Sequence, residues 1–514
     1  MTLLNALKTK AAGNAFFVFV FISLFFYYNL NETLFYPPQS LHIWRQTNCL
    51  SLTQNYYQHN VPFLQPEMHN QLCEDGTSGK VVGEFPIIYY VVAQVWKLFG
   101  KHEWIFKLLQ IAILFLGLFS LFHATQRIVH NRFFAGFISL LLFTSPMIIY
   151  YGPNFLPDVP ALSFVFMAWY FISRYFDKRK TVNLWISASL FCLAMLLKIT
   201  SALSFFALGG WVLYEIIFQD KNKRFFKFGF KQILPFIFGF ILVVSWYLYV
   251  EHFNTMHKGS ISYHGIWPVW KMQQEQFNRI IDVLDKIYFK EMFLPFTQYT
   301  TLGIWIFLMV IIKKLHPFSR YLIVVMAIGF TAQMMLWFQV LEGHDYYQIN
   351  LLVVLVTVWI IFLKQINNMK PVIKYIAYSL VITFFVFNAI TCKHRAGERY
   401  LGWMNGSYEN NMKALITIEP LFKELGIEEN DKVISVPDPS INASLYYMNR
   451  KGFTDYGSDF SKIEGFYQRI GLGAKYLVVN DSTLLSKEFL APLIQKKIGQ
   501  HQNVIIFDIQ NLQP

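Results

Sequence analysis

The sequence predicts an all-α polytopic membrane protein with about eleven transmembrane helices, interfacial helices in its first outer loop and a small C-terminal α/β domain. Hydrophobic residues make up 55% of the 514 residues, and charged residues only 15%. A soluble domain does not need so much apolar surface for its core. The net charge of +13 comes from Lys and Arg residues that lie between apolar runs, which indicates membrane topology and no nucleic-acid partner.

The expected spans are apolar runs of about 17–20 residues, the length that crosses a bilayer. They cover about 15–34, 105–124, 133–151, 159–176, 182–198, 200–218, 232–250, 298–314, 321–340, 347–364 and 372–391. The first run follows Lys8 and Lys10, as a signal peptide would, but it lacks a small-residue cleavage site, so we expect a retained helix. The apolar segment 86–99 would rise only about 21 Å as a helix, too short for a bilayer core of about 30 Å, and is expected in the interface.

Loop charge predicts the orientation of these spans. With a cytoplasmic N-terminus, the inner loops carry most of the Lys and Arg residues, whereas the short outer loops near 152–158 and 341–346 carry none. This is the distribution that the positive-inside rule requires, and counting 86–99 as a span would invert it. One basic cluster falls on the outer side against the rule: Lys393, His394, Arg395 and Arg399.

Three larger regions then face outward, at about 35–104, 251–297 and 392–514. We therefore expect a membrane domain, 1–391, followed by a C-terminal domain that begins at 392. In this tail, strand-like runs at 432–436, 476–479 and 504–509 alternate with helical stretches at 412–425 and 489–497, a pattern typical of a compact α/β unit.

The four cysteines do not have the spacing of a structural zinc site. Cys49 and Cys73 share the first outer loop. They would form a disulfide if that loop faces an oxidising compartment, and two separate thiols are the alternative.

Residues capable of chemistry gather on the predicted outer side. The first loop contains Trp44, Arg45 and Gln46 and, later, Glu84, Phe85 and Pro86, while Pro157 and Asp158 form a short outer turn. Two further outer turns contain Lys198 and the run Glu342, Gly343, His344, Asp345, Tyr346 and Tyr347.

In their order and common side, these motifs resemble the GT-C superfamily of membrane glycosyltransferases, which includes the protein mannosyltransferases, the aminoarabinose transferases that act on lipid A and a bacterial branch with a WRQ loop. The resemblance covers about 1–391. It implies transfer of a sugar from a polyprenyl-phosphate donor to a lipid, polysaccharide or protein acceptor, with inversion. It also implies a bacterial inner membrane, with the C-terminal domain in the periplasm.

Such a reaction needs a carboxylate to take the proton of the acceptor. The relatives commonly have an acidic residue at the position of Asn48, and Asn cannot take a proton at neutral pH. Glu84 is the leading alternative, although a carboxylate before a helix also stabilises the helix dipole. Asp158 matches the PD motif of the relatives, although it would also cap the next helix.

The reaction also needs cations and donors that stabilise the departing phosphate. The resemblance implies Arg45, Lys198, His344 and Tyr346 for this role, although a lysine can instead extend toward the headgroups and tyrosines are common at membrane boundaries. His42, Gln46 and Asp345 are expected to bind the acceptor or support the site.

The sequence assigns no cofactor. A divalent metal ion is one possibility, because its ligands could come from Glu84, Asp158, His344 and Asp345, but their spacing fixes no coordination geometry. The second outer loop is expected to act as a lid that orders with substrate. Its His252, His257 and His264 are expected to be surface side chains.

Two other hypotheses remain. Asn48 would also suit an inactive protein of the same fold that serves as a partner subunit. A lipid or sugar transporter would instead have ionisable residues and broken helices at the bilayer midplane.

Overall fold

The structure is a computed structural model that describes residues 9–259, 265–401, 406, 408–510 and 512. Its contacts divide the chain into two compact units. The first, here called the helical unit, comprises 1–35, 104–246 and 265–397, and the second, the mixed unit, comprises 36–103, 247–264 and 398–514.

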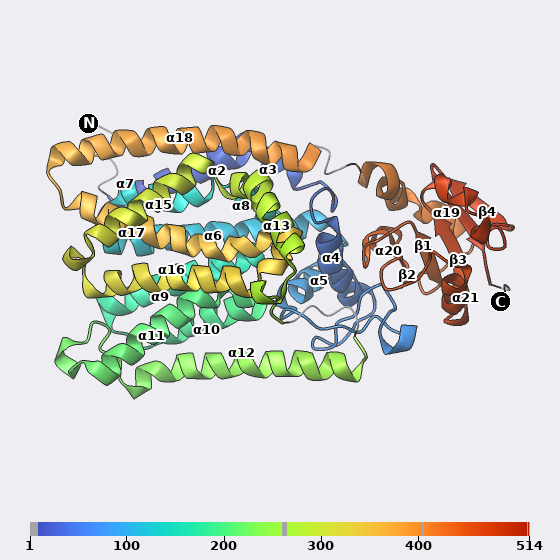
Figure 1. Cartoon of the computed structure of the whole chain (residues 1–514), viewed down its shortest axis with the longest axis horizontal. Helices are drawn as coiled ribbons and strands as arrows, with labels where there is room; N and C mark the ends of the chain where they lie inside the picture. Colours follow the sequence, from blue (N-terminus) through green and yellow to red (C-terminus); the bar gives the residue numbers. More distant parts are fainter. Residues whose placement is uncertain (1–8, 260–264, 402–405, 407, 511, 513–514) are drawn as a thin grey trace. The chain divides into compact units, whose positions relative to one another are not determined.

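Long helices that run side by side make up the helical unit (Figure 1). Its first helices are α2 (Lys10–Tyr27), α3 (Leu30–Thr33), α6 (Glu103–Val129), α7 (Arg132–Leu142), α8 (Pro146–Tyr151), α9 (Asp158–Lys178), α10 (Val182–Leu197), α11 (Leu203–Phe218) and α12 (Phe230–Met256). Then follow α13 (Gln274–Val283), α14 (Phe289–Met292), α15 (Pro295–Val310), α16 (Pro317–Leu336), α17 (Leu352–Asn367) and α18 (Pro371–Leu401). The short helix η8 (Asp345–Leu351) precedes α17. Three of these helices contain residues of the mixed unit: Glu103 in α6, residues 247–256 in α12 and residues 398–401 in α18.

Among the described residues, eight helices are long and apolar enough to cross a membrane, or nine if the bent pair Gln274–Met292 and Pro295–Val310 is one span. The expected number of about eleven is therefore not confirmed. The run 133–151 is broken, because the hydroxyl of Ser145 accepts from the N–H of Ile148 and starts a new helix at Pro146. The run 182–198 forms α10, which has only 16 residues.

Close helix contacts hold the centre of this unit together. A Cβ atom on Gly117 of α6 would lie 2.6 Å from Cβ of Ser163 on α9, so only glycine permits this approach. Ser187 of α10 donates to the carbonyl of Ala168 on α9 across 3.1 Å. These contacts hold α9 against α6 and α10. A candidate site lies at the N-terminal end of α9.

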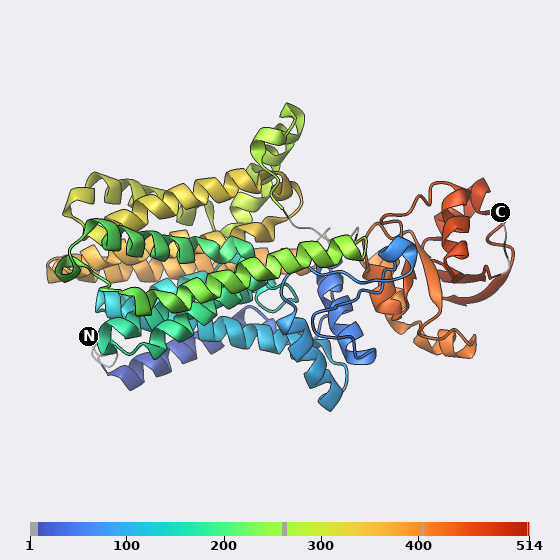
Figure 2. The ribbon, with the colours of Figure 1, turned by 90° about the horizontal axis from the view of Figure 1, so that it is seen from below.

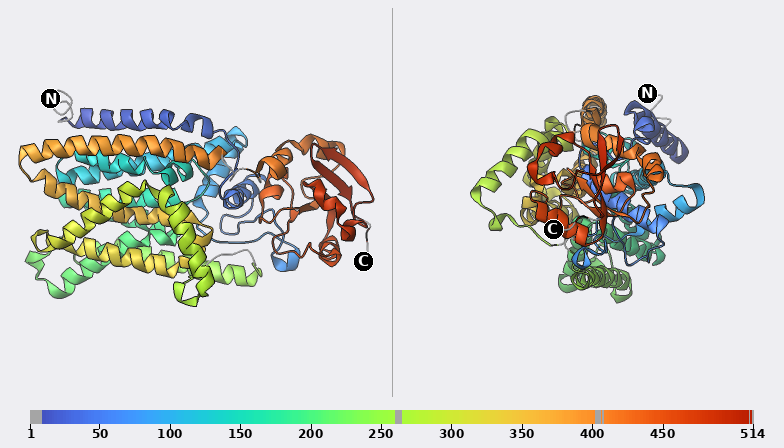
Figure 3. Two further views of the ribbon diagram at one scale, coloured as in Figure 1. Left: turned by 45° about the horizontal axis from the view of Figure 1, so that its top comes forward. Right: turned by 90° about the vertical axis from the view of Figure 1, so that its right-hand side faces the viewer.

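The mixed unit combines the first outer loop with the tail. It contains α4 (Ile43–Gln58), α5 (Ile87–Phe99), α19 (Glu419–Glu424), α20 (Ala443–Met448) and α21 (Ile463–Gly471). Its strands are β1 (Lys432–Val436), β2 (Gly452–Phe453), β3 (Ala474–Val479), β4 (Lys497–His501) and β5 (Val504–Asp508). Figure 2 and Figure 3 show the strands of the tail as arrows between its helices.

The sheet has the order β2-β1-β3-β5-β4, in which β2, β1 and β3 are parallel and the other two pairings are antiparallel. Side chains alternate between its faces. Val433 and Val478 pack with α19 and α20, whereas Ile434 and Val479 belong to the cluster that contains Phe466 of α21. Ile43 of α4 belongs to the first of these clusters, so the first outer loop and the tail share one core.

The edge of the sheet beside β2 is covered by the first outer loop. The N–H of Gly452 donates to the carbonyl of His69, and its carbonyl accepts from the N–H of Gln71. A Cβ atom on Gly452 would lie 1.9 Å from the carbonyl oxygen of Val433, and its φ is +155°, so this position requires glycine.

The three predicted strands of the tail are confirmed, and the predicted helical stretch 412–425 is confirmed in part, as a short 3-10 helix followed by α19. The predicted helix at 489–497 is wrong. Only a short turn of 3-10 helix, Glu488–Leu490, forms there, and β4 begins at Lys497. Pro492 has no N–H to donate within a helix, and the chain instead pairs with β5.

Candidate active site

A hairpin of two helices in the helical unit brings a carboxylate and a lysine together. α9 begins at Asp158, and Lys198 directly follows the last residue of α10. A carboxylate is stabilised at a helix N-terminus and a cation at a C-terminus. Lys198 Nζ lies 3.5 Å from Asp158 Oδ1, so the two charges form an ion pair.

This ion pair is withdrawn from solvent. The side chain of Asp158 is 0% exposed and that of Lys198 is 7% exposed. Two buried charges are expensive to desolvate, and removal of one leaves the other uncompensated. A buried pair at the ends of membrane helices is therefore typical of a binding or catalytic site.

Aromatic rings complete the surroundings of Lys198. Its Nζ lies 5.1 Å from the ring centroid of Tyr346 and 4.5 Å from that of Tyr347. Ring faces attract a cation. The hydroxyl of Tyr346 lies 3.3 Å from Nδ1 of His344, whose side chain is exposed. Four residues that the sequence singled out, Asp158, Lys198, His344 and Tyr346, are thus brought together.

Asp345 is buried beside the turn that carries Tyr346. It is 0% exposed, and the hydroxyl of Tyr151 donates to its Oδ1 across 2.5 Å. This bond joins α8 to η8. Asp345 therefore supports the turn that carries Tyr346.

A second buried lysine, not expected from the sequence, lies beside the segment that leads to Asp158. Lys107 is 2% exposed, donates to the carbonyl of Thr33 across 2.8 Å and lies 5.2 Å from the ring centroid of Phe155. Gln110, one turn further along α6, donates to the carbonyl of Leu156 across 3.1 Å. Both side chains hold the segment that leads to Asp158. The signal was a lysine and a glutamine within the apolar run 105–124, spaced for one helix face.

In the mixed unit, the two motifs of the first outer loop meet. Arg45 of α4 forms a hydrogen-bonded ion pair with Glu84, which lies two residues before the N-cap of α5. The two side chains are 19% and 21% exposed, so this pair remains accessible. The motif around Arg45 and the motif around Glu84 are therefore joined by one ion pair.

Gln46 and His42 shape the start of α4. The amide of Gln46 donates to the carbonyls of Gln39 and Leu41, across 2.9 and 2.8 Å. His42 has a φ of 57°, in the left-handed region, and precedes the helix as its N-cap. These residues orient the turn before Arg45.

Asn48 is joined to the tail. Its Oδ1 accepts from Nδ2 of Asn442 across 2.9 Å, and Oδ1 of Asn442 accepts from the N–H of Asn70 across 2.9 Å. Asn48 is only 7% exposed. Asn48 is therefore a structural link between α4 and the tail.

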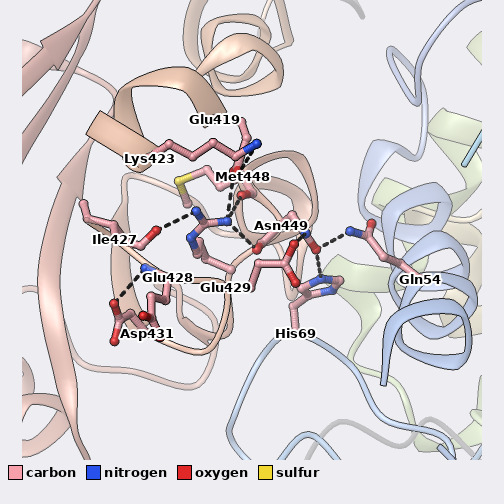
Figure 4. A network of polar contacts seen from close by, with 11 residues as sticks. Gln54, His69, Glu419, Lys423, Ile427, Glu428, Glu429, Asp431, Met448 and Asn449 are labelled. Atoms are coloured by element: carbon pink, nitrogen blue, oxygen red, sulfur yellow. Dashed lines mark hydrogen bonds and ion pairs between the residues drawn. The ribbon is translucent and has the colours of Figure 1, made fainter. Parts of the chain in front are cut away.

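A polar network joins α4 to the tail more extensively (Figure 4). Asn449 Oδ1 accepts from the amide of Gln54 and lies 3.4 Å from Nε2 of His69. Nδ1 of His69 lies 2.7 Å from the hydroxyl of Ser51. Burial lowers the pKa of His69 to about 3, so its ring is neutral at physiological pH.

Two cations lie beside this network. Arg450 is 1% exposed and donates to the carbonyls of Asn449 and Ile427, each across 2.9 Å. Lys101 donates to Gln54 across 2.9 Å and lies 4.7 Å from the ring centroid of Tyr446. Burial lowers the pKa of Lys101. These residues were missed by the sequence analysis, because their contacts join segments that lie far apart in the chain.

The second outer loop corrects one expectation. α12 continues past residue 250 to Met256, and Nδ1 of His257 lies 2.5 Å from Oε1 of Glu74. This hydrogen bond lowers the pKa of Glu74. His257 is only 14% exposed and is therefore not a surface side chain. His252 is exposed as expected, and His264 lies outside the described residues.

Cys49 and Cys73 are both buried thiols, so the disulfide is not observed. Sγ of Cys49 lies 3.3 Å from the hydroxyl of Tyr89 instead. Within the part of the chain that the structure describes, no group of three or more His, Cys, Asp or Glu side chains is arranged to hold a metal ion.

Comparison with known proteins agrees with the helical architecture. Residues 84–249 match the family model of dolichyl-phosphate-mannose-protein mannosyltransferase. Comparison with curated proteins finds no significant match.

Solved structures resemble the whole chain. ArnT from Cupriavidus metallidurans in the apo state has a TM-score of 0.58 at 12% identity and covers 97% of this chain and 98% of its own. The same protein bound to undecaprenyl phosphate has a TM-score of 0.57. The oligosaccharyltransferase of Archaeoglobus fulgidus, tethered to an acceptor peptide, has a TM-score of 0.53 at 11% identity, with coverage of 87% of this chain and 66% of that one. The arabinofuranosyltransferase AftD from Mycobacteria has a TM-score of 0.55 at 10% identity, with coverage of 98% and 40%.

Proposed function

We propose that this chain, which has the fold of the GT-C membrane glycosyltransferases, transfers a sugar from a polyprenyl-phosphate donor to an acceptor on the outer face of the membrane. The observation that carries the proposal is the buried ion pair of Asp158 and Lys198 under the ring of Tyr346. Two charges withdrawn from solvent at helix ends suit a ligand that is itself charged and attached to a lipid.

The chemistry follows from what the leaving group requires. The acceptor hydroxyl attacks the anomeric carbon, its proton passes to a carboxylate, and the bond from carbon to the phosphate oxygen breaks with its electrons on the phosphate. Two cations are candidates for neutralising that phosphate: Lys198 of the helical unit and Arg45 of the mixed unit. His344 and Tyr346 would donate hydrogen bonds to phosphate oxygens.

Each of these cations is paired with a carboxylate before substrate binds. A phosphate that binds Lys198 or Arg45 competes with Asp158 or Glu84 for the same cation. The displaced carboxylate would then be available for the proton of the acceptor. Glu84 is the better candidate base because it is 21% exposed, whereas Asp158 is fully buried and better suited to holding Lys198 in place.

Asn48 does not take part in proton transfer under this proposal. Its Oδ1 is engaged by Asn442, and an amide does not accept a proton at neutral pH. The alternative of an inactive partner subunit is favoured by this single residue. The two functions differ in one measurable respect, because an inactive subunit binds the donor without consuming it.

The loop charges support an N-terminus in the cytoplasm and a periplasmic tail in a bacterial inner membrane. The acceptor is a lipid, polysaccharide or protein. The assay must therefore vary both the sugar of the donor and the divalent metal ion.

The test is a donor-consumption assay with the purified full chain and a panel of polyprenyl-phosphate sugars, with and without divalent cations. Release of polyprenyl phosphate that depends on Lys198 supports the enzyme. Binding of the donors without turnover supports the inactive subunit. If the chain neither binds nor consumes any donor, the proposal is wrong, and lipid or sugar translocation in vesicles becomes the next measurement.

A further inference from the structure

A cavity of about 270 Å³ lies within the helical unit, away from Asp158 and Lys198. Its lining residues come from α2, α6, α7 and α18, which lie close together (Figure 3). Phe122 of α6 forms part of its wall. Gln110, which contacts the segment before Asp158, lies about 18 Å from Phe122 along the helix axis. No lining residue belongs to the candidate active site.

The walls of this cavity are largely apolar, and six of the thirteen lining residues are Phe. Phe17 of α2 stacks on Phe122, with ring centroids 5.2 Å apart. Protein interiors contain few voids larger than a water molecule, because an empty apolar cavity forfeits packing energy. Ile382, which also lines the cavity, is 51% exposed, so the cavity opens onto the surface of the helix bundle. An acyl chain of the bilayer can therefore enter it.

Two glycines create the space. Gly13 of α2 and Gly136 of α7 both line the cavity. A Cβ atom on Gly136 would lie 3.9 Å from the ring of Phe122, which is ordinary van der Waals contact. Alanine is therefore tolerated at position 136, whereas a branched side chain would extend into the space.

One end of the cavity is basic. Arg132, at the start of α7, is the charged residue in the lining. Lys10 begins α2 and lies one turn before Gly13, which also lines the cavity. The N-termini of α2 and α7, at Lys10 and Arg132, favour anions at this end as well.

The start of α7 is held rigidly. Nδ2 of Asn131 donates to Oδ1 of Asn367 on α17 across 3.0 Å and to the hydroxyl of Tyr378 on α18 across 2.7 Å. Its Oδ1 caps α7 by accepting from the N–H of Phe134. The backbone that carries Arg132 therefore has a fixed position at the lining of the cavity.

We propose that this cavity binds an anionic phospholipid, with one acyl chain among the aromatic side chains and the phosphate headgroup at Arg132 and Lys10. A basic site between transmembrane helices next to an apolar wall is the combination that recognises such lipids. A zwitterionic lipid would place its own cation among these residues, so it is disfavoured. The proposal does not depend on the glycosyltransferase function.

The experiment counts the lipids that remain bound to the delipidated full chain by native mass spectrometry, after addition of phosphatidylglycerol or phosphatidylcholine. Wild-type protein is expected to retain phosphatidylglycerol preferentially. Gly136→Leu is expected to abolish that preference, whereas Gly136→Ala retains it. Arg132→Gln is expected to weaken phosphatidylglycerol binding about fivefold, since one basic residue contributes about 1 kcal/mol to binding of an anionic headgroup. Lys178→Gln, which removes an exposed cation outside the cavity, serves as the charge control.

Equal retention of the two lipids by wild-type protein would overturn the proposal. So would unchanged phosphatidylglycerol binding in both Gly136→Leu and Arg132→Gln. If Gly136→Leu does not fold, Arg132→Gln and Gly136→Ala still decide the question. Displacement of phosphatidylglycerol by polyprenyl phosphate at equal concentration would assign the cavity to the donor lipid, and would also contradict the proposal.

Discussion

The side-chain amide of Asn442 donates to Oδ1 of Asn48 across 2.9 Å, and so links the tail to the helix that carries Arg45. Both residues belong to the mixed unit. Nδ2 of Asn442 needs only an acceptor at position 48, and a carboxylate offers one as well as an amide does. Position 48 can therefore change its charge without changing its contact.

Asn48→Asp is accordingly expected to fold and to lose less thermal stability than a variant that removes the acceptor. Asn48→Leu removes the acceptor and leaves the amide of Asn442 buried and unsatisfied, at a cost of about 1–3 kcal/mol. Thermal unfolding in detergent measures both. A large loss of stability in Asn48→Asp would contradict the view that this position acts as an acceptor.

Asn48→Asp also tests the missing base. If the site can use a carboxylate at this position, turnover of the variant should exceed that of wild-type protein and gain a dependence on pH near the pKa of an aspartate, about 4. Unchanged turnover would assign proton transfer to another residue, as proposed for Glu84.

Glu84→Gln is expected to lower turnover by about 10²–10⁴-fold, the usual contribution of a general base, with a small effect on donor binding. It keeps the shape of the side chain and a hydrogen bond to Arg45. Glu67→Gln is the matched control, because it removes a carboxylate of the same loop that pairs with Lys451. Equal turnover in Glu84→Gln and wild-type protein would exclude Glu84 as the base.

Lys198→Ala is expected to lower turnover by about 100-fold or more, because it removes a cation from the phosphate. It also leaves Asp158 buried without its cation, and stability should fall by about 3–5 kcal/mol. Both effects are measured on the same purified protein, as donor consumption and as thermal unfolding.

The double variant Asp158→Asn with Lys198→Met separates the two effects. It removes both charges, so stability should return close to the wild-type value while turnover stays low. Recovery of turnover in the double variant would show that the pair is needed only for folding.

His69 predicts the pH dependence of stability. The pKa of this buried ring is about 3 in the folded chain and 6.5 when exposed. The unfolded state therefore binds a proton that the folded state does not, so stability is full above about pH 6.5. It falls by about 1.4 kcal/mol for each pH unit below that value. Replacement by Gln, which cannot titrate, should flatten the slope between pH 4 and 6.5 in chemical unfolding experiments. Parallel slopes in the two proteins would contradict this prediction.

Hydropathy alone predicted much of the helical unit, because an apolar run of 17–20 residues has few alternatives to a helix in a membrane. It did not predict the helix break at Ser145 or the 16-residue length of α10. Where a helix begins and ends depends on local hydrogen bonds, which hydropathy does not describe. The motif order predicted that Asp158, Lys198, His344 and Tyr346 lie on one outer side, and the structure brings these four residues together. Lys107 was overlooked, although a lysine and a glutamine on one face of the apolar run 105–124 were a signal for it. The role of Asn442 could not be predicted, because it lies nearly 400 residues from Asn48 in the chain.

The backbone bonds of Gly452 affect how the tail folds during synthesis of the chain. Residues His69 and Gln71, which bond to its backbone, are synthesised some 380 residues before it. Until they meet, the short strand at Gly452 remains an open edge of the sheet. Open edges pair readily with other chains. A tail expressed by itself would keep that edge permanently, so a soluble fragment for structural or binding work should carry the segment around His69, fused or co-expressed, to prevent self-association.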